Sequence, residues 1–469
     1  MRRAASIILS LSAALVLGGC NHNAGHGGGG GGGNGGGNGD GSAPTCVGKA
    51  CQTTCSAGAA TTLTGTVFAP NGTLPLYNAI VYIPSTTPDP FPQGATCDRC
   101  NGNISGNPIV QTLTGPDGKF TLSDVPVGDN VPLVVQLGKW RRQTTLANIP
   151  SCMSTALPAE NTRLPKNSSE GDIPKIAIVT GSADPMECLL LKIGMDPAEI
   201  QEPAGNTRIS FFQGANSPGT TMSGATPDGT TLYGDQATLM SYDLVMLPCE
   251  GAEYDQTKKS PTGPANIVNY VNAGGRVFTT HYSYDWWHYA NSPFEGVATW
   301  QPGQADDYND ANGIQGVLDQ TFPKGMAFAQ WLIAAGVSAA SPSGQLNIVQ
   351  GRHDVSAVQG ATQSWINFNT FPANSNKETP PGVVSPGVMH MTFNTPINAP
   401  PDDMGNPQYC GRAVFSDFHV TTDALKGGNK TFPGACVTPY TLSDQEKALA
   451  FMLFDLSSCV QSDTTIPIS

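Results

Sequence analysis

The chain has 469 residues, of which 55 are Gly and 38 are Pro, and only 13% are charged. Its formal net charge is −13 at pH 7 and no basic stripe runs along it, which argues against nucleic acid or another polyanion as a partner. The length allows two or three domains, and the abundance of Gly and Pro predicts many loops and much β-structure.

Residues 1–20 have the pattern of an export signal. Two arginines precede an apolar run over residues 4–16, and small residues then lead to Cys20. The run is too short for a structural membrane-spanning helix. The pattern resembles a bacterial lipoprotein signal, which implies cleavage before Cys20 and a lipid on its thiol, and Asn21 after the cysteine favours the outer membrane. In the alternative, an ordinary secretory signal, the cysteine is coincidental.

Residues 21–58 connect this signal to the folded part. Residues 21–42 are mostly Gly, with Asn and His scattered among them, and have almost nothing apolar to bury, so we expect a flexible tether followed by a Cys-rich segment. A lipid on Cys20 anchors a chain without spanning the bilayer. The resemblance therefore implies a protein that is lipid-anchored in the bacterial envelope, on its periplasmic or its surface face.

Twelve cysteines in an exported chain predict disulfides. With Cys20 lipidated an odd number remains, so one thiol of the second domain is expected to stay free or to pair between chains. Cys97 and Cys100 have the spacing of a redox motif or a zinc knuckle. Because they lack a second matching pair and a thioredoxin-like context, we favour structural disulfides for both.

Residues 59–150 are predicted to form a small all-β sandwich, because short alternating runs are separated by Gly and Pro turns. The expected strands are 63–68, 79–84, 110–113, 120–122 and 133–137. On the segments 64–67, 117–120 and 125–128, this region resembles the carboxypeptidase regulatory-like (prealbumin-like) domain, which implies an accessory unit without catalytic residues. The basic and aromatic exit at 139–142 either holds a glycan or acidic partner or contacts the acidic second domain.

Residues 170–460 are predicted to form an α/β domain, because buried strands alternate with amphipathic helices. The expected strands are 173–181, 239–247, 276–280 and 411–416, and the expected helices are 186–195, 265–273 and 442–457. Ser443 and Glu446 have the spacing of a capping box at the start of the last helix. A Pro- and Asn-rich insertion at 291–409 is predicted to form a mixed subdomain or lid over the sheet.

This α/β part resembles the class I glutamine amidotransferase-like superfamily, and more closely its trehalose-utilisation-type branch. The likeness lies in the strand ending at Thr180 and Gly181 and in the segments 274–281 and 411–419. It implies a flavodoxin-like parallel sheet, with a nucleophilic cysteine at the elbow and a histidine after a late strand. Here His281 or Tyr282 occupies the elbow, so the cysteine is missing. Cys249 ends a different strand and is not expected to take that role.

Five polar residues lie at or just past the ends of predicted parallel strands, and these ends share one edge of a sheet. They are Glu250, His281, Tyr282, Asp285 and His419. One interpretation makes His281 and His419 a general acid/base pair with Glu250 or Asp285 setting their protonation. Two histidines and a carboxylate also suit zinc. In the third interpretation they are a polar network that joins sheet and insertion in a binding protein.

The aromatic residues Tyr282, Trp286 and Trp287 are candidate ligand-binding residues that would stack on a sugar, although a packed core explains them equally well. The leading expectation is a binding or recognition role at the cell envelope, with carbohydrate or another envelope component as ligand and with no cofactor or metal. The alternative is a hydrolase or other acid/base enzyme centred on His281 and His419.

Overall fold

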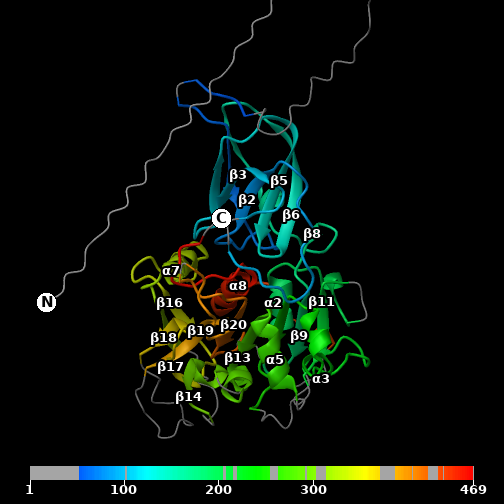
Figure 1. The fold of residues 1–469 in the computed structure, drawn as a ribbon, viewed down its shortest axis with the longest axis vertical. Helices are drawn as coiled ribbons and strands as arrows, with labels where there is room; N and C mark the ends of the chain where they lie inside the picture. The colour runs from blue at the N-terminus through cyan, green and yellow to red at the C-terminus, as the bar shows by residue number, and fades with distance from the viewer. Residues whose placement is uncertain are drawn as a thin grey trace, which may run out of the picture. The chain divides into compact units, whose positions relative to one another are not determined.

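The computed structural model describes residues 52–467 except for 57, 101–102, 204–206, 215–218, 254–261, 291–292, 303–312, 370–385, 404, 421–430 and 437. The predicted signal, the lipidation at Cys20 and the Gly-rich tether lie outside this part. The fold is rich in sheet, with β-sandwich-like sheets and a large mixed sheet (Figure 1). Among the described helices, none has both the length and the hydropathy of a membrane span.

Two sheets form the β-sandwich-like part, as predicted for this region. A three-stranded sheet has the order β4-β1-β7: β4 (Lys119–Ser123), β1 (Thr62–Thr66), β7 (Ser154–Ala156). A five-stranded sheet has the order β3-β2-β5-β6-β8: β3 (Pro108–Leu113), β2 (Ile80–Pro84), β5 (Gly128–Leu137), β6 (Trp140–Ile149), β8 (Gly171–Asp172). Inward side chains of both sheets, including Leu63, Val81, Leu122 and Val135, belong to one core cluster.

The largest sheet has ten strands in the order β10-β11-β9-β12-β13-β20-β19-β18-β15-β16. Its first six strands run parallel: β10 (Ile200–Gln201), β11 (Ile209–Gln213), β9 (Ile176–Thr180), β12 (Leu244–Leu247), β13 (Arg276–Thr280), β20 (Gly411–Ser416). The strands β9, β12, β13 and β20 are buried at every position. Burial at every position is typical of parallel strands that are covered on both faces.

The insertion predicted as a subdomain or lid mainly extends this sheet instead. Its strands pair antiparallel: β19 (Gly387–Thr395), β18 (Gln363–Phe368), β15 (Ile314–Leu318), β16 (Gln345–Ile348). Because β19 is in register with β20 along six residue pairs, the sheet that we expected to be parallel is mixed. A separate two-stranded sheet joins β14 (Ala298–Trp300) to β17 (Val355–Val358).

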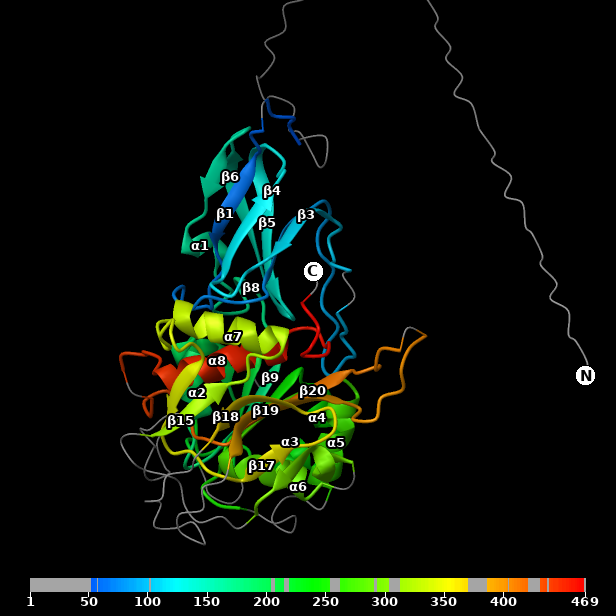
Figure 2. The same cartoon turned by 90° about the vertical axis from the view of Figure 1, so that its left-hand side faces the viewer.

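Helices cover both faces of the ten-stranded sheet (Figure 2). Side chains alternate along a strand, so Ile176 and Ile178 of β9 belong to one core cluster and Ala177 and Val179 to another. The first cluster includes residues of α2 (Met186–Lys192), α7 (Pro323–Ala334), α8 (Asp444–Ser457). The second includes residues of α3 (Thr230–Tyr233), α4 (Gln236–Met240), α5 (Gly263–Asn272), α6 (Asp285–His288).

The last helix, α8, begins as its sequence predicts. The Ser443 hydroxyl accepts a hydrogen bond from the Glu446 backbone N–H at 3.2 Å, and the Glu446 carboxylate accepts one from the Ser443 N–H at 2.8 Å. Most side chains of α8 are buried, because the helix lies against the large sheet and also contacts the β-sandwich. Trp140 of β6 packs edge-on against Phe454 of α8, with ring centroids 5.9 Å apart.

The basic segment that leaves the sandwich is part of this contact. Lys139 Nζ lies 2.5 Å from Asp243 Oδ1, and Trp140 is fully buried. Of the two interpretations of residues 139–142, the contact within the chain is the one that the structure shows.

Disulfides reinforce the same contact. Cys97 bonds to Cys410 and Cys100 bonds to Cys459, so both cysteines have the structural role that we predicted, although not with each other. Further disulfides join Cys55 to Cys152 within the sandwich region, and Cys188 to Cys436 within the α/β part. Cys249 takes part in none of the disulfides of the described residues.

Candidate functional site

Three adjacent parallel strands bring a thiol and two imidazoles to one edge of the large sheet. Cys249 comes two residues after β12, His281 directly follows β13, and His419 comes three residues after β20. Because β13 pairs with both β12 and β20 in parallel register, the carboxyl ends of the three strands lie side by side.

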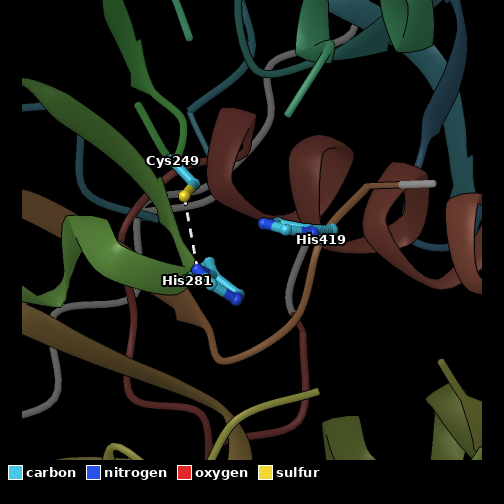
Figure 3. A group of neighbouring side chains, drawn as sticks. All are labelled: Cys249, His281 and His419. Atoms are coloured by element: carbon cyan, nitrogen blue, oxygen red, sulfur yellow. Dashed lines mark hydrogen bonds between the residues drawn. The ribbon is translucent and has the colours of Figure 1, made fainter. Parts of the chain in front are cut away.

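The three side chains lie close together, with His281 in contact with both of the others (Figure 3). Cys249 Sγ lies 3.3 Å from His281 Nδ1, and the rings of His281 and His419 stack with centroids 3.9 Å apart. One possible ligand atom from each residue lies within 4.8 Å of the other two. The residues are 0%, 1% and 4% exposed, so their polar atoms interact in a medium of low dielectric constant. We call this group the Cys-His-His cluster.

The backbone at His281 has a conformation that residues other than Gly rarely adopt. Thr280 is extended, with φ −133°, whereas His281 has φ +49° and begins a short 3-10 turn, η3 (His281–Tyr284). Gln350, which contacts His419, also has a positive φ, of +56°. A non-Gly residue in this region costs on the order of 1–3 kcal/mol, and such strain concentrates at functional sites.

Hydrogen bonds from neighbouring residues orient the cluster. The Gly251 N–H donates to Cys249 Sγ at 3.3 Å. His419 Nδ1 lies 3.2 Å from Gln350 Oε1, and because an amide oxygen only accepts, Nδ1 carries the proton in this contact. This contact therefore favours the tautomer of His419 in which Nε2 has the lone pair.

A buried ion pair lies beside the cluster. Arg352 holds both carboxylate oxygens of Asp354, at 2.8 and 2.9 Å, and its guanidinium lies 4.2 Å above the Tyr282 ring. The Tyr282 ring meets His281 edge-on at 4.6 Å. Burial first, and then the charge of Arg352, lower the pKa of His281 well below its ordinary value, so this imidazole is neutral at pH 7.

A second carboxyl completes this ion pair. The Asp354 N–H donates to Asp417 Oδ2 at 2.7 Å. Burial, and then the charge of Asp354, raise the pKa of Asp417 well above its usual range. Arg352 and Asp354 therefore form a charge-balanced pair, and the surroundings of Asp417 favour its protonated form over a second buried carboxylate.

The structure brings some of the predicted site residues together and leaves others outside the Cys-His-His cluster. His281 and His419 lie against each other, and Tyr282 contacts His281. Glu250 and Asp285 are outside the group of candidate ligand atoms within 4.8 Å that the described residues form. Glu250 accepts from Ser182 Oγ through its backbone carbonyl at 3.2 Å, and Asp285 is buried at the start of α6.

Trp286 and Trp287 lie in the apolar core on one face of the sheet. They are 2% and 0% exposed, and Trp287 Nε1 donates to Thr279 Oγ1 at 2.9 Å. Trp286 packs edge-on against Tyr233 at 4.9 Å. Both rings are therefore buried in the core of the described part.

Sequence reasoning missed Cys249 as a member of the site. Its position after a strand was visible, but the cluster depends on β12 lying beside β13, and a single sequence does not reveal strand order. Gln350 and the buried Asp184 were also missed, because each comes from a loop that reaches the site through tertiary contacts.

No known protein-family profile and no curated protein match the chain. Among solved structures, it is similar to a putative ThuA-like protein from Parabacteroides merdae ATCC 43184, at 13% identity over 61% of this chain and 92% of that one, with a TM-score of 0.28. The β-galactosidase from Rahnella sp. R3 matches at 12% identity over 61% of this chain and 32% of that one, with a TM-score of 0.26. A chain of a type II cohesin-X-dockerin complex from Acetivibrio cellulolyticus matches at 15% identity over 29% of this chain and 85% of that one, with a TM-score of 0.17. Scores this low assign neither family nor function.

Proposed function

We propose that this protein is lipid-anchored in the bacterial envelope and binds a transition-metal ion through Cys249, His281 and His419. The observation that carries the proposal is the convergence of one thiol and two imidazoles, within 4.8 Å of one another, from three adjacent strand ends. Thiolate and imidazole are the ligands that zinc and copper prefer, whereas calcium and magnesium take oxygen ligands. A metal ion thus replaces carbohydrate as the ligand that we favour.

The separations of the candidate ligand atoms are close to those of a metal-bound set. A tetrahedral ion with bonds of about 2.0–2.3 Å separates its ligand atoms by roughly 3.3–3.7 Å. Cys249 Sγ and His281 Nδ1 are already 3.3 Å apart, and the limit of 4.8 Å for the whole set requires shifts of only about 1 Å. The contacts of Gly251 with the thiol and of Gln350 with His419 are of the kind that fix metal ligands in place.

The rest of the proposal follows from the architecture. The run of neighbouring strands β11-β9-β12-β13-β20 is parallel, which agrees with a flavodoxin-like order and with the amidotransferase-like, trehalose-utilisation-type fold that we propose for residues 170–460. For residues 59–150 we propose a carboxypeptidase regulatory-like sandwich that acts as an accessory unit. The lipoprotein-like signal and the Gly-rich tether would hold both parts at the outer membrane.

Titration of the full chain with Zn²⁺, followed by calorimetry, tests the proposed function. We expect one ion per chain, and we expect Cys249→Ser, His281→Gln and His419→Gln each to weaken binding at least tenfold, because each removes one of three ligands. His288→Gln, a change of a half-buried histidine on α6 outside the cluster, is the matched control and should leave the affinity unchanged. Binding that survives Cys249→Ser unaltered would show that the ion sits elsewhere.

A thiol-dependent hydrolase is the second candidate, because Cys249 Sγ lies within hydrogen-bond distance of His281 Nδ1. In that mechanism His281 accepts the thiol proton, but burial and Arg352 lower the pKa of His281 and oppose this transfer. We therefore expect iodoacetamide to alkylate Cys249 slowly in the metal-free chain at pH 6, with a rate that His281→Gln hardly changes. Rapid alkylation that His281→Gln abolishes would favour the hydrolase over the metal site.

A further inference from the structure

We infer that Asp184 is a positioning residue that holds His281 and His419 of the Cys-His-His cluster together. Through its hydrogen bond with Thr280, it also keeps Cys249 in place. This inference rests on the proposed function, since it explains how the three ligands are held together. Asp184 lies in the loop between β9 and α2 and is not one of the three candidate ligands. No spacing in the sequence connects it to the cluster.

The carboxylate of Asp184 joins the two segments that carry the histidines. Its Oδ1 accepts a hydrogen bond from the Val420 N–H at 2.6 Å, and its Oδ2 accepts one from the Thr280 hydroxyl. Val420 directly follows His419, and Thr280 directly precedes His281. One carboxylate therefore sets the separation of the chain at positions 280 and 420, and with it the stacking of the two imidazoles.

The third ligand is held through Thr280. The Cys249 N–H donates to Thr280 Oγ1 at 3.1 Å, while the same hydroxyl donates its hydrogen to Asp184. Asp184, Thr280, Val420 and Cys249 are all 0% exposed, so water does not compete for these bonds. A hydrogen bond to an ionised carboxylate is about twice as strong as one between neutral groups.

Only an acceptor-only side chain satisfies this arrangement. A carboxylate accepts from the Val420 N–H and from the Thr280 hydroxyl at once. The nearly isosteric Asn would present an NH₂ group to one of these two donors. The Thr280 hydroxyl would then point its hydrogen toward the Cys249 N–H. The contact of Thr280 with residue 184 and its contact with Cys249 would both be weakened, although the substitution leaves no cavity.

The test compares Asp184→Asn and Thr280→Val with two controls in the full chain, titrated with Co²⁺. Both variants should weaken Co²⁺ binding 10–100-fold, the usual effect of losing an outer-shell partner, and should change the thiolate-to-cobalt absorption band. Thr280→Ser keeps the hydroxyl and should bind like the wild type. The double variant should lose little more than either single one, because both break one network.

Asp243→Asn is the matched control for a purely structural role. Asp243 is buried, accepts from the Lys175 N–H at 2.5 Å, and directly precedes β12, the strand that Cys249 follows, but at the opposite edge of the sheet. It should lower the melting temperature while leaving Co²⁺ affinity and the absorption band unchanged. If Asp184→Asn behaves like Asp243→Asn, the inference is overturned.

A second readout separates this inference from the proposed function. In the metal-free chain, Asp184→Asn and Thr280→Val should raise the rate at which iodoacetamide labels Cys249, measured by mass spectrometry, whereas Asp243→Asn should not. If the wild-type chain binds no Co²⁺, the proposed metal site is wrong, but a faster labelling of these two variants still supports Asp184 as the positioning residue. Unchanged labelling together with unchanged Co²⁺ binding refutes it.

Discussion

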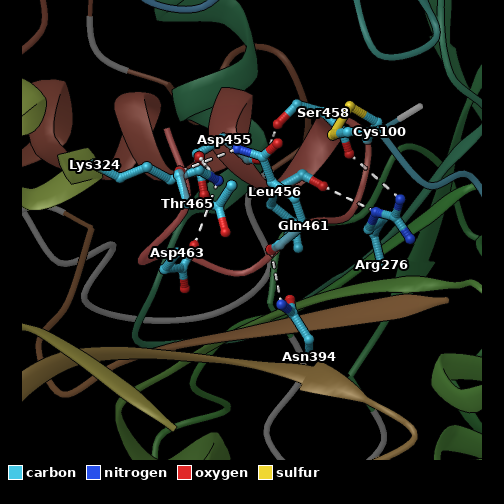
Figure 4. Close-up of a disulfide and its surroundings, with 11 residues drawn as sticks. Cys100, Arg276, Lys324, Asn394, Asp455, Leu456, Ser458, Gln461, Asp463 and Thr465 are labelled. Atoms are coloured by element: carbon cyan, nitrogen blue, oxygen red, sulfur yellow. Dashed lines mark hydrogen bonds and ion pairs between the residues drawn. A yellow bond between two sulfur atoms is a disulfide. The ribbon is translucent and has the colours of Figure 1, made fainter. Parts of the chain in front are cut away.

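Asp455→Asn should lower the free energy of unfolding by about 3–5 kcal/mol, because it breaks a buried cluster of charges. Asp455 of α8 lies 2.8 Å from Lys324 Nζ and 2.8 Å from the Arg412 guanidinium. Asp463 lies 2.7 Å from Arg412 and 3.4 Å from Lys324. The two cations and two carboxylates have side chains that are at most 5% exposed. Figure 4 draws Lys324, Asp455 and Asp463 in one view with the disulfide of Cys100.

The expected loss follows from the balance of charge in this cluster. Burial acts to raise the pKa of Asp455, but Lys324 and Arg412 outweigh it and hold this pKa below its usual value. Neutralising Asp455 leaves two buried cations with the single carboxylate of Asp463. An uncompensated buried charge is far more costly than the loss of a surface ion pair.

Urea unfolding of Asp455→Asn and of a control variant on the same helix checks this prediction. Asp444→Asn is the matched control, because Asp444 also belongs to α8 and pairs with Lys447 at 3.2 Å, but its side chain is 58% exposed. We expect the control to change the free energy of unfolding by less than about 1 kcal/mol. Losses of similar size in the two variants would contradict the central role that we assign to the buried cluster.

Glu187→Gln should make the chain more stable than the wild type at alkaline pH, in contrast to most substitutions of a buried residue. Glu187 of α2 is 0% exposed. Burial, which the charge of Asp184 reinforces, raises the pKa of Glu187 to about 7 from 4.5. Because the pKa of Glu187 is higher in the folded state than in the unfolded state, its contribution to the free energy of unfolding is fully present below pH 4.5. This contribution is lost as the pH rises through about 7.

The size of this effect follows from the shift. A difference of about 2.5 pKa units corresponds to roughly 3 kcal/mol, reached once both states are ionised above about pH 8. Gln carries no titrating proton, so the stability difference between variant and wild type should grow by that amount between pH 4.5 and 8. Unfolding curves measured at intervals over this range test the prediction, and parallel stability profiles of the two proteins would contradict it.

Local sequence pattern was enough to predict many elements of the fold. The buried runs that became β9, β13 and β20, the capping box of α8 and the β-rich first part each depend on neighbouring residues, and all are present in the structure. The pattern also placed His281 and His419 at the carboxyl ends of their strands. Because such ends share an edge in a parallel sheet, this was sufficient to expect the two histidines in one place.

The sequence by itself indicated the strands β9, β13 and β20, the helix α8 and the strand ends at which His281 and His419 stand, because hydrophobic periodicity and caps are local properties. It was wrong at residues 239–247, where a single strand was expected but the helix α4 ends at Met240 and β12 begins only at Leu244. The tertiary structure decided which strands are neighbours. It placed β12 beside β13 and so brought Cys249 to His281, let β19 extend the sheet, and directed Asp184 to Thr280 and Val420. These contacts join segments that are up to 236 residues apart, and they depend on how whole faces of helices and sheet pack together, which no short stretch of sequence encodes.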